Sequence, residues 1–199
     1  MMRRIHKGRA AGFTLIELLI VVAIIAILAA IAVPNFLEAQ VRSKVSRVVG
    51  DMRSIAVGLE AYCSDNGKYP PMAANGAYVD WTDRLKPLTS PVAYLSSYSI
   101  FKDIFNNDTL SDWNQTAYLN LERIYVYRDK KSMEEWPGQE AAVRSVWYNP
   151  DSILNGTTWQ LISYGPDRNF ESNNDWDINT LYDTTNGTRS RGDIIRVGP

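Results

Sequence analysis

The sequence predicts an α+β protein in which one long amino-terminal helix packs on a small antiparallel β-sheet head. Three observations support this class: an unbroken apolar run near the start of the 199-residue chain, a helical stripe of apolar residues after it, and short β-branched or aromatic runs in the second half. Hydrophobic residues make up 45%, charged residues 22%, and the net charge is −1. This composition favours neither a disordered chain nor a nucleic-acid-binding protein.

The first 33 residues divide into a leader and an apolar segment. Residues 1–12 contain no acid and four bases, Arg3, Arg4, Lys7 and Arg9. Residues 13–33 carry one charge, Glu17, and as a helix they span about 31 Å, which matches one bilayer core. We therefore expect a transmembrane helix over 13–33, with the basic leader in the cytoplasm and the acidic remainder of the chain across the membrane.

Residues 34–62 change from wholly apolar to amphipathic. Apolar side chains recur at spacings of three and four, which is the period of a helix with one buried face: Leu37, Val41, Val45, Val48, Met52, Ile55, Leu59 and Tyr62. Pro34 lacks a backbone N–H and is expected to kink or locally open this helix. The turn cluster Ser64–Gly67 predicts its end, because Gly67 can take a left-handed conformation.

Residues 63–199 are expected to form the globular head, with a loop-rich carboxyl terminus. Runs of β-branched and aromatic residues bounded by turn residues predict a small antiparallel sheet from four strands, the last at its edge: Leu121–Arg128, Val143–Tyr148, Thr158–Tyr164 and Asp193–Val197. Short helices are expected at Trp81–Leu88 and Ile100–Phe105. This head would pack on the amphipathic helix.

The histidine and cysteine counts argue against several chemistries. His6 is the single histidine and lies in the leader, and Cys63 is the single cysteine. Without further partners, neither histidine-based nucleophilic catalysis nor a histidine-bound zinc site is available. The chain also lacks the Walker, G-x-S-x-G and HExxH motifs. We expect a protein that is not an enzyme and requires no cofactor.

Two general interpretations compete for the amino terminus. A secretory signal peptide would be cut near Ala30-Ile31-Ala32, although 16 consecutive apolar residues exceed the usual length. A plain signal anchor explains the length but not Glu17, because a carboxylate in a membrane segment costs about 2.5–3.5 kcal/mol. Glu17 therefore needs a partner or a task.

The string Gly12-Phe13-Thr14-Leu15-Ile16-Glu17, behind a short basic leader, resembles the cleavage and methylation segment of type IV pilins and type II secretion pseudopilins. The resemblance covers residues 8–62. It implies that a prepilin peptidase cuts between Gly12 and Phe13, that the new amine of Phe13 is methylated, and that Pro34 is the family's proline at mature position 22. In a polymer of parallel helices, Glu17 could then neutralise the amine of a neighbouring copy.

The resemblance is greatest to the major pseudopilin, because Asn66-Gly67-Lys68-Tyr69-Pro70 is similar to a segment that commonly follows its long helix. It implies a structural subunit of a type II secretion pseudopilus, built into a homopolymeric filament with other pseudopilins by an inner-membrane assembly machinery. The subunit would wait in the bacterial inner membrane with its head in the periplasm, before joining a periplasmic or extracellular filament. A type IV pilin is the alternative, and a membrane-anchored or secreted enzyme or binding protein is a third.

The same resemblance suggests a calcium site. The stretch from Gly165 to Ile178 is similar to the loop after the sheet in the major pseudopilin, where a calcium ion holds irregular chain together. The oxygen donors that calcium prefers are present at Asp167, Asn173, Asp175 and Asp177. Their spacing is not that of an EF-hand, and solvated turns produce similar acidic clusters.

Overall fold

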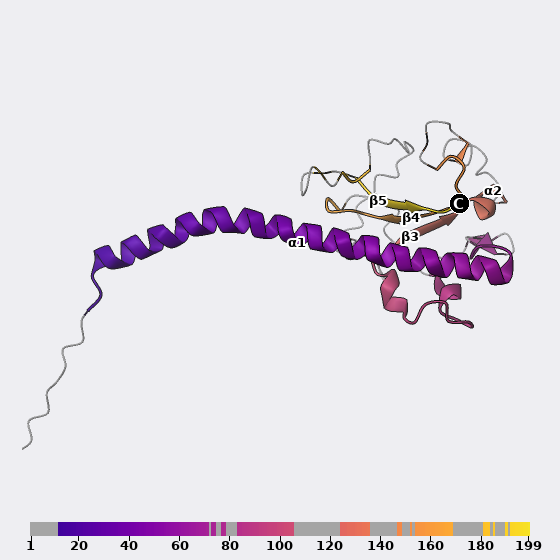
Figure 1. The fold of residues 1–199 in the computed structure, drawn as a ribbon, viewed down its shortest axis with the longest axis horizontal. Coiled ribbons are helices and arrows are strands. Elements are labelled where there is room, and N and C mark those ends of the chain that lie inside the picture. Colours follow the sequence, from indigo (N-terminus) through magenta and orange to yellow (C-terminus); the bar gives the residue numbers. More distant parts are fainter. Residues whose placement is uncertain are drawn as a thin grey trace, which may run out of the picture. The chain divides into compact units, whose positions relative to one another are not determined.

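A computed structural model describes residues 12–71, 73–74, 77–78, 83–105, 124–135, 147–148, 152, 154–168, 181–183, 185, 190 and 192–199. Figure 1 shows the elements, which follow in this order: helix α1 (Leu15–Asn66), strands β1 (Ala73–Ala74) and β2 (Ala77–Tyr78), 3-10 helices η1 (Lys86–Leu88) and η2 (Tyr98–Phe101), strand β3 (Val126–Asp129), helix α2 (Lys130–Glu134), and strands β4 (Trp159–Ser163) and β5 (Ile194–Val197). The predicted α+β class, a long helix followed by a small antiparallel sheet, is confirmed.

The chain divides into two compact units, Met1–Gln40 and Val41–Pro199, and α1 contributes to both. In the first unit, every residue from Phe13 to Phe36 is exposed. The helix is long and apolar enough to cross a membrane by length and composition. Its helical conformation continues through Pro34. Because proline has no N–H, the carbonyl of Ala30 lacks its usual helical donor there.

In the second unit, one face of α1 is buried, as the apolar period predicts. The residues of α1 with buried side chains or backbone are Val45, Val48, Met52, Ile55, Ala56, Gly58 and Leu59. Val41 and Tyr62 pack against them as partly buried neighbours. The expectation for Leu37 was wrong: it is 52% exposed, because it precedes the first residue of the head unit.

Helix α1 ends where the turn cluster predicts. Asn66 is its last residue, and Gly67 follows with a left-handed φ of 69°. The Gly67 N–H donates to the carbonyl oxygen of Cys63 at 2.8 Å, which satisfies one of the last helical carbonyls. The side-chain amide of Asn66 donates to the carbonyl oxygen of Tyr62 at 2.9 Å. Together these bonds turn the chain back toward the head.

The sheet of the head has the strand order β3-β4-β5, and both pairs are antiparallel. In register, Leu161 of β4 lies between Tyr127 of β3 and Arg196 of β5. All five residues of β4 are buried, as expected for a central strand covered on both faces. The predicted strands at Thr158–Tyr164 and Asp193–Val197 are therefore confirmed as β4 and the edge strand β5.

The other predicted elements of the head need correction. Residues 121–123 of the run Leu121–Arg128 lie outside the described residues; the described part forms an isolated bridge between Ile124 and Lys102 and then strand β3, which begins at Val126 and extends one residue beyond the predicted end. In the run Val143–Tyr148, Trp147 is helical and Tyr148 lies in a bend, and the rest lies outside the described residues. Aromatic composition predicted a strand there, but β-propensity mostly reports packing on a half-buried surface, which a buried Trp147 can find in other conformations.

The two expected helices are also shorter than predicted. Of Trp81–Leu88, the described part forms a turn and the three-residue η1, with Pro87 inside it. Of Ile100–Phe105, only the first two residues are helical, as the end of η2. A run this short cannot offset the cost of helix nucleation, so tertiary packing sets the conformation instead.

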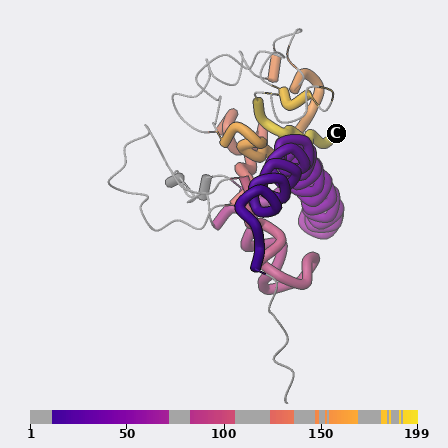
Figure 2. Tube along the Cα trace, turned by 90° about the vertical axis from the view of Figure 1, so that its left-hand side faces the viewer, coloured from indigo at the N-terminus to yellow at the C-terminus, as the bar shows by residue number. Residues whose placement is uncertain are grey.

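The core of the head joins α1, the sheet and the segment 83–105. In Figures 1 and 2 the sheet lies above the second half of α1, and residues 83–105 lie below it. Buried side chains from all three parts form one cluster, including Met52 and Leu59 of α1, Leu88 and Phe101 of the segment, and Leu161 of β4. Burying a large apolar side chain contributes about 1.5–3 kcal/mol, so this cluster holds the amphipathic half of α1 in the head.

Candidate functional site: the start of helix α1 and the polar contacts of the head

The start of α1 is a capping box formed by Thr14 and Glu17. The Glu17 N–H donates to Thr14 Oγ1 at 3.2 Å, and the Thr14 N–H donates to Glu17 Oε2 at 2.9 Å. The Thr14 hydroxyl also donates to Glu17 Oε2, at 2.8 Å. Thr14 is thus the N-cap and Glu17 the third helical residue, and each satisfies an N–H that the helix leaves without a partner.

The junction between Gly12 and Phe13 lies immediately before this capping box. Phe13 is 76% exposed, and no atom lies within 4 Å of the position that a Cβ on Gly12 would take. The peptide bond is therefore open to a protease. Cleavage there would create an amine one residue before the Thr14 N–H that Glu17 already accepts. The carboxylate of Glu17 thus lies at the end of the helix where a new positive charge would appear.

Behind the capping box, α1 presents large apolar side chains in all directions. Exposed examples with fractions between 52% and 84% are Leu15, Ile16, Leu19, Ile24, Ile27, Leu28 and Ile31. A contiguous apolar surface of this extent is typical of a segment that is covered by lipid or by other protein chains. The first unit supplies no such cover among the described residues. This segment therefore has two features that other molecules can use, an apolar surface that needs cover and the charge of Glu17.

The sequence indicated a role for Glu17, whereas the role of Thr14 emerges from the structure. The signal was present, because Thr14-Leu15-Ile16-Glu17 fits the capping-box pattern of threonine or serine followed three residues later by glutamate. The family resemblance concerns the charge of Glu17, whereas the capping box concerns its local hydrogen bonds. In the structure Glu17 has a partner within its own chain.

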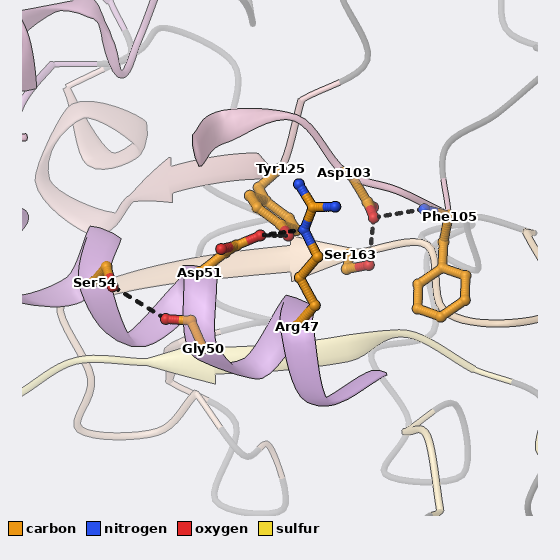
Figure 3. A network of polar contacts seen from close by, with 8 residues as sticks. All are labelled: Arg47, Gly50, Asp51, Ser54, Asp103, Phe105, Tyr125 and Ser163. Atoms are coloured by element: carbon orange, nitrogen blue, oxygen red, sulfur yellow. Dashed lines mark hydrogen bonds and ion pairs between the residues drawn. The ribbon is translucent and has the colours of Figure 1, made fainter. Parts of the chain in front are cut away.

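A second polar cluster, which nothing in the sequence indicated, surrounds Asp103 in the head. Its carboxylate is 4% exposed and accepts hydrogen bonds from the Phe105 N–H at 3.0 Å, the Ser163 hydroxyl at 2.9 Å and the Tyr164 N–H at 3.0 Å. Figure 3 shows its bonds to Ser163 and Phe105. Burial raises the pKa of Asp103 above its ordinary value, and the three hydrogen bonds oppose that rise. Asp103 therefore ties the end of the segment 83–105 to β4.

One polar contact joins α1 to the sheet side of the head, and an ion pair within α1 lies beside it. The Tyr125 hydroxyl donates to Asp51 Oδ2 at 3.3 Å, and Arg47 Nε lies 3.6 Å from the same oxygen, as Figure 3 shows. Burial, with the carboxylates of Asp103 and Asp51 nearby, raises the pKa of Tyr125 far above its ordinary value, so its hydroxyl stays protonated and donates. The Tyr125–Asp51 hydrogen bond therefore ties α1 to the residue that precedes β3.

Farther along α1, Glu60 receives two donors from the head. Trp159 Nε1 donates to Glu60 Oε1 at 2.9 Å, and the Tyr69 hydroxyl donates to Oε2 at 3.0 Å. The rings of Tyr69 and Trp159 meet edge to face, with their centroids 6.4 Å apart. Tyr69 belongs to the Gly67–Pro70 segment that the sequence singled out. The structure thus gives that segment a packing role.

Of the four predicted calcium ligands, the structure describes Asp167. Asn173, Asp175 and Asp177 lie outside the described residues. Asp167 Oδ2 accepts a hydrogen bond from the Gly192 N–H at 3.0 Å, which links two loops beside β4 and β5. In the described part of the chain, no three acidic, histidine or cysteine side chains come together as metal ligands. The calcium site stays a prediction.

Comparison with known proteins bears on the amino-terminal part of the chain. Residues 7–33 match the prokaryotic N-terminal methylation motif. Over 65 residues the chain is 48% identical to the type IV major pilin protein PilA of Myxococcus xanthus, covering 33% of this chain and 30% of that protein. Over another 65-residue match it is 42% identical to the type II secretion system core protein G of Pseudomonas aeruginosa, covering 33% and 46%.

A further relative is the type IV wide pilus major component PilA4 of Thermus thermophilus, with 50% identity over 60 residues, 30% of this chain and 46% of that protein. The chain thus spans less than half the length of these curated relatives. No solved structure matches the chain. The resemblance to type IV pilins and pseudopilins is confirmed for the amino-terminal third, which carries the methylation motif and matches members of both groups.

Proposed function

We propose that this chain, whose amino-terminal third is of the prepilin type, is a structural subunit of a type II secretion pseudopilus. The observation that carries the proposal is the open Gly12–Phe13 junction, followed at once by the Thr14–Glu17 capping box and an exposed apolar helix. Such a helix has two environments that can cover it: a membrane before assembly and other helices afterwards. The subunit is thus built for assembly, and we propose no catalytic role.

The proposed sequence of events follows from charge and burial. A prepilin peptidase removes residues 1–12 and with them four bases, and the new amine of Phe13 is methylated. The helix of the waiting subunit lies in the inner membrane with the head in the periplasm. The inner-membrane assembly machinery then packs it among other copies and other pseudopilins, where the Glu17 carboxylate offsets the amine of a neighbour because an unpaired buried charge is costly.

The capping box adds a second task for Glu17. The acceptance of the Thr14 N–H orients the carboxylate toward the end of the helix before any neighbour arrives. A carboxylate at a helix amino terminus is also favoured by the helix dipole. Pre-orientation of this kind reduces the entropy lost on pairing.

A type IV pilin is the second candidate, since relatives of both kinds match the same region. The cysteine count favours the pseudopilin. Major pilins often close a carboxy-terminal loop with two cysteines, and this chain has one cysteine, Cys63, near the end of α1. The similarity of Asn66–Pro70 to the major pseudopilin's segment points the same way.

Mass spectrometry and amino-terminal sequencing of the membrane-extracted protein test the proposal. The mature chain should begin at a methylated Phe13 and lack 12 residues. A start at Val33 would indicate a signal peptide, and retention of residues 1–12 would indicate a plain anchor; either result contradicts the proposal. Deletion of the gene then separates the two candidates, since a pseudopilin mutant loses protein secretion while a pilin mutant loses surface filaments.

A further inference from the structure

We propose that the outward face of α1 in the head, defined by Lys44, Arg47, Gly50, Arg53, Ser54 and Val57, is a docking surface for the acidic head of a second copy of this chain. All six residues are exposed in the structure. The proposal rests on the proposed filament function and names the contact through which the heads would join. Three properties of this face support it: its charge, its central glycine and its position along the helix.

The charges of the head unit are unevenly divided. Residues 41–62 contain four bases and two acids, whereas residues 63–199 contain 13 bases and 18 acids. Residues 41–62 of the helix are therefore net positive, and residues 63–199 are net negative. Complementary charges of this kind steer two copies together and suppress wrong orientations. In a polymer of identical subunits, one copy supplies the basic helix and another supplies the acidic surface.

The bases on this face do little for the single subunit. Arg47 makes an exposed ion pair with Asp51, at 3.6 Å, and such pairs add little to stability. Neither Lys44 nor Arg53 makes an ion pair within the part of the chain that the structure describes. Their charges therefore remain available to a partner.

Gly50 lies near the middle of the face, and the described residues give no steric reason for a glycine there. None of their atoms lies within 4 Å of the position that its Cβ would occupy, although glycine is unfavourable in a helix interior. Gly58 differs, because its Cβ position lies 3.0 Å from Leu95 Cγ. Figure 3 shows the Ser54 hydroxyl turned back to the Gly50 carbonyl oxygen, at 3.2 Å. A partner can thus approach the backbone of α1 closely here.

Val57 adds an apolar contact point, since it is 70% exposed one turn beyond Ser54. A membrane surface is the rival occupant, because anionic lipids also attract bases. Arg53, however, follows Val33, the last residue of the uninterrupted apolar run, by 20 positions, which is about 30 Å of helix. Charges in physiological salt act over roughly 8–10 Å, so the lipid surface does not reach Arg53. Arg53 therefore needs another partner for its charge, and the net negative head of a second copy can supply it.

Charge reversal tests the proposal in the full-length chain, expressed in a host that assembles it. Arg53→Glu and Lys44→Glu should each lower the amount of filament about tenfold or more, relative to the subunit pool in the membrane. The matched control is Lys131→Glu, which makes the same charge change on an exposed residue of α2. It should assemble within about twofold of wild type. Equal loss in all three variants would make net charge the cause and overturn the proposal.

Substitutions of Gly50 provide an independent test of the docking surface. Gly50→Ala should raise the melting temperature of the head by a few degrees, because alanine favours the helix and meets no atom. Gly50→Trp should nevertheless block assembly while the head stays folded. A photo-crosslinker at Val57 should give an adduct with the mass of two copies in assembling cells. Normal filaments from Gly50→Trp and Arg53→Glu would overturn the docking surface.

Two other outcomes separate the possible failures. If the reversal variants are depleted from the membrane fraction before assembly, the basic face serves the lipid surface and the proposal is wrong. If the wild-type chain is not processed at Phe13 and forms no filament, the proposed function itself fails. Normal processing and assembly of wild type, with no effect of any variant on the face, contradicts only the docking surface.

Discussion

The two halves of α1 share one secondary structure and differ in what covers them. From Phe13 to Phe36 every side chain is exposed, whereas Val48, Ile55 and Leu59 in the second half are fully buried. The first half is apolar on all sides, and the second half is apolar on one. A helix that is apolar all round needs an environment that its own chain does not provide, while a striped helix can be covered by its own head.

The polar groups of the two halves differ in the same way. In the first half, Glu17 bonds to Thr14, three residues away in sequence. In the second half, Asp51 and Glu60 receive bonds from residues 74 and 99 positions away, Tyr125 and Trp159. The hydrogen bonds of Glu17 in the first half are local, whereas the long-range hydrogen bonds of the second half fix it in the tertiary structure. Mutations in the first half should therefore affect assembly, whereas mutations of buried residues in the second half should affect folding.

Glu17→Val should have the largest effect. The variant removes the insertion penalty and should enter the membrane at least as well as wild type, yet an unpaired amine in the filament costs about 3–5 kcal/mol, or roughly 100-fold or more in assembly. Glu17→Gln is the matched control, because its amide oxygen can still accept from the Thr14 N–H but carries no charge. Filament yield after shearing measures both. If Glu17→Gln assembles normally, capping and not charge is the function of Glu17.

Leu59→Ala and Leu19→Ala compare the halves directly. Leu59 is fully buried and Leu19 is 69% exposed. Removing the Leu59 side chain should lower the free energy of unfolding of the head by about 3 kcal/mol, or roughly 10 °C in melting temperature. Leu19→Ala should leave the head unchanged. Tryptophan fluorescence of the full chain in detergent reads out only the head, because all six tryptophans lie at position 81 or later. Equal shifts in melting temperature for the two variants would contradict the difference between the two halves of α1.

Asp103→Ala should destabilise the head by about 2 kcal/mol, since two buried donors and one partly buried donor lose their acceptor while the cost of burying a charge disappears. Wild-type stability should also depend on pH. Because the folded pKa is raised above the ordinary value of 3.8, the folded state binds the proton more tightly, and stability falls as pH rises from that value through the folded pKa.

Asp103→Asn separates the effect of protonation on stability from the effect of the hydrogen bonds. It keeps one acceptor oxygen for Phe105 and Ser163 but cannot titrate. Melting between pH 3 and pH 7 should therefore lose the component of the slope that Asp103 contributes. An identical slope in the variant and in wild type would assign the pH dependence to other groups.

The smallest expected effect is that of calcium. If Asp167, Asn173, Asp175 and Asp177 hold the ion, millimolar calcium should raise the melting temperature of the head by roughly 3 °C, because a ligand that binds only the folded state stabilises it. Asp175→Ala together with Asp177→Ala should abolish the rise. Equal midpoints in calcium and in chelator would leave the acidic cluster as a solvated turn. The exposed half of α1 should be insensitive to calcium in either case.

Local chemistry made several features predictable. The period of apolar residues located the buried face of α1 from Val41 to Tyr62, and the turn residues located its end at Asn66. β-Branched runs located β4 and β5. The Thr14–Glu17 capping box was readable as a pattern of two residues. In each case the relevant interaction joins residues within one turn, one strand or one loop.

Contacts between distant residues were not predictable in this way. No pattern indicates that Asp103 would bond to Ser163, 60 positions away, or that Trp159 would donate to Glu60. Composition misled at Trp147, because a buried aromatic side chain fits many backbone conformations. Leu37 followed the period of the stripe and is still exposed, since periodicity shows which face is apolar and not how far the head reaches.

The amino-acid pattern alone was therefore sufficient for the long apolar helix, for the capping-box pattern at its start and for its amphipathic continuation, because backbone hydrogen bonds and side-chain period act over a few residues. The processing junction between Gly12 and Phe13 stays a prediction. The three-dimensional arrangement was needed to show where the cover of α1 begins, which carboxylates are buried and which glycine has no neighbour. Those properties depend on close packing between segments distant in sequence, and packing of that kind has no local signature.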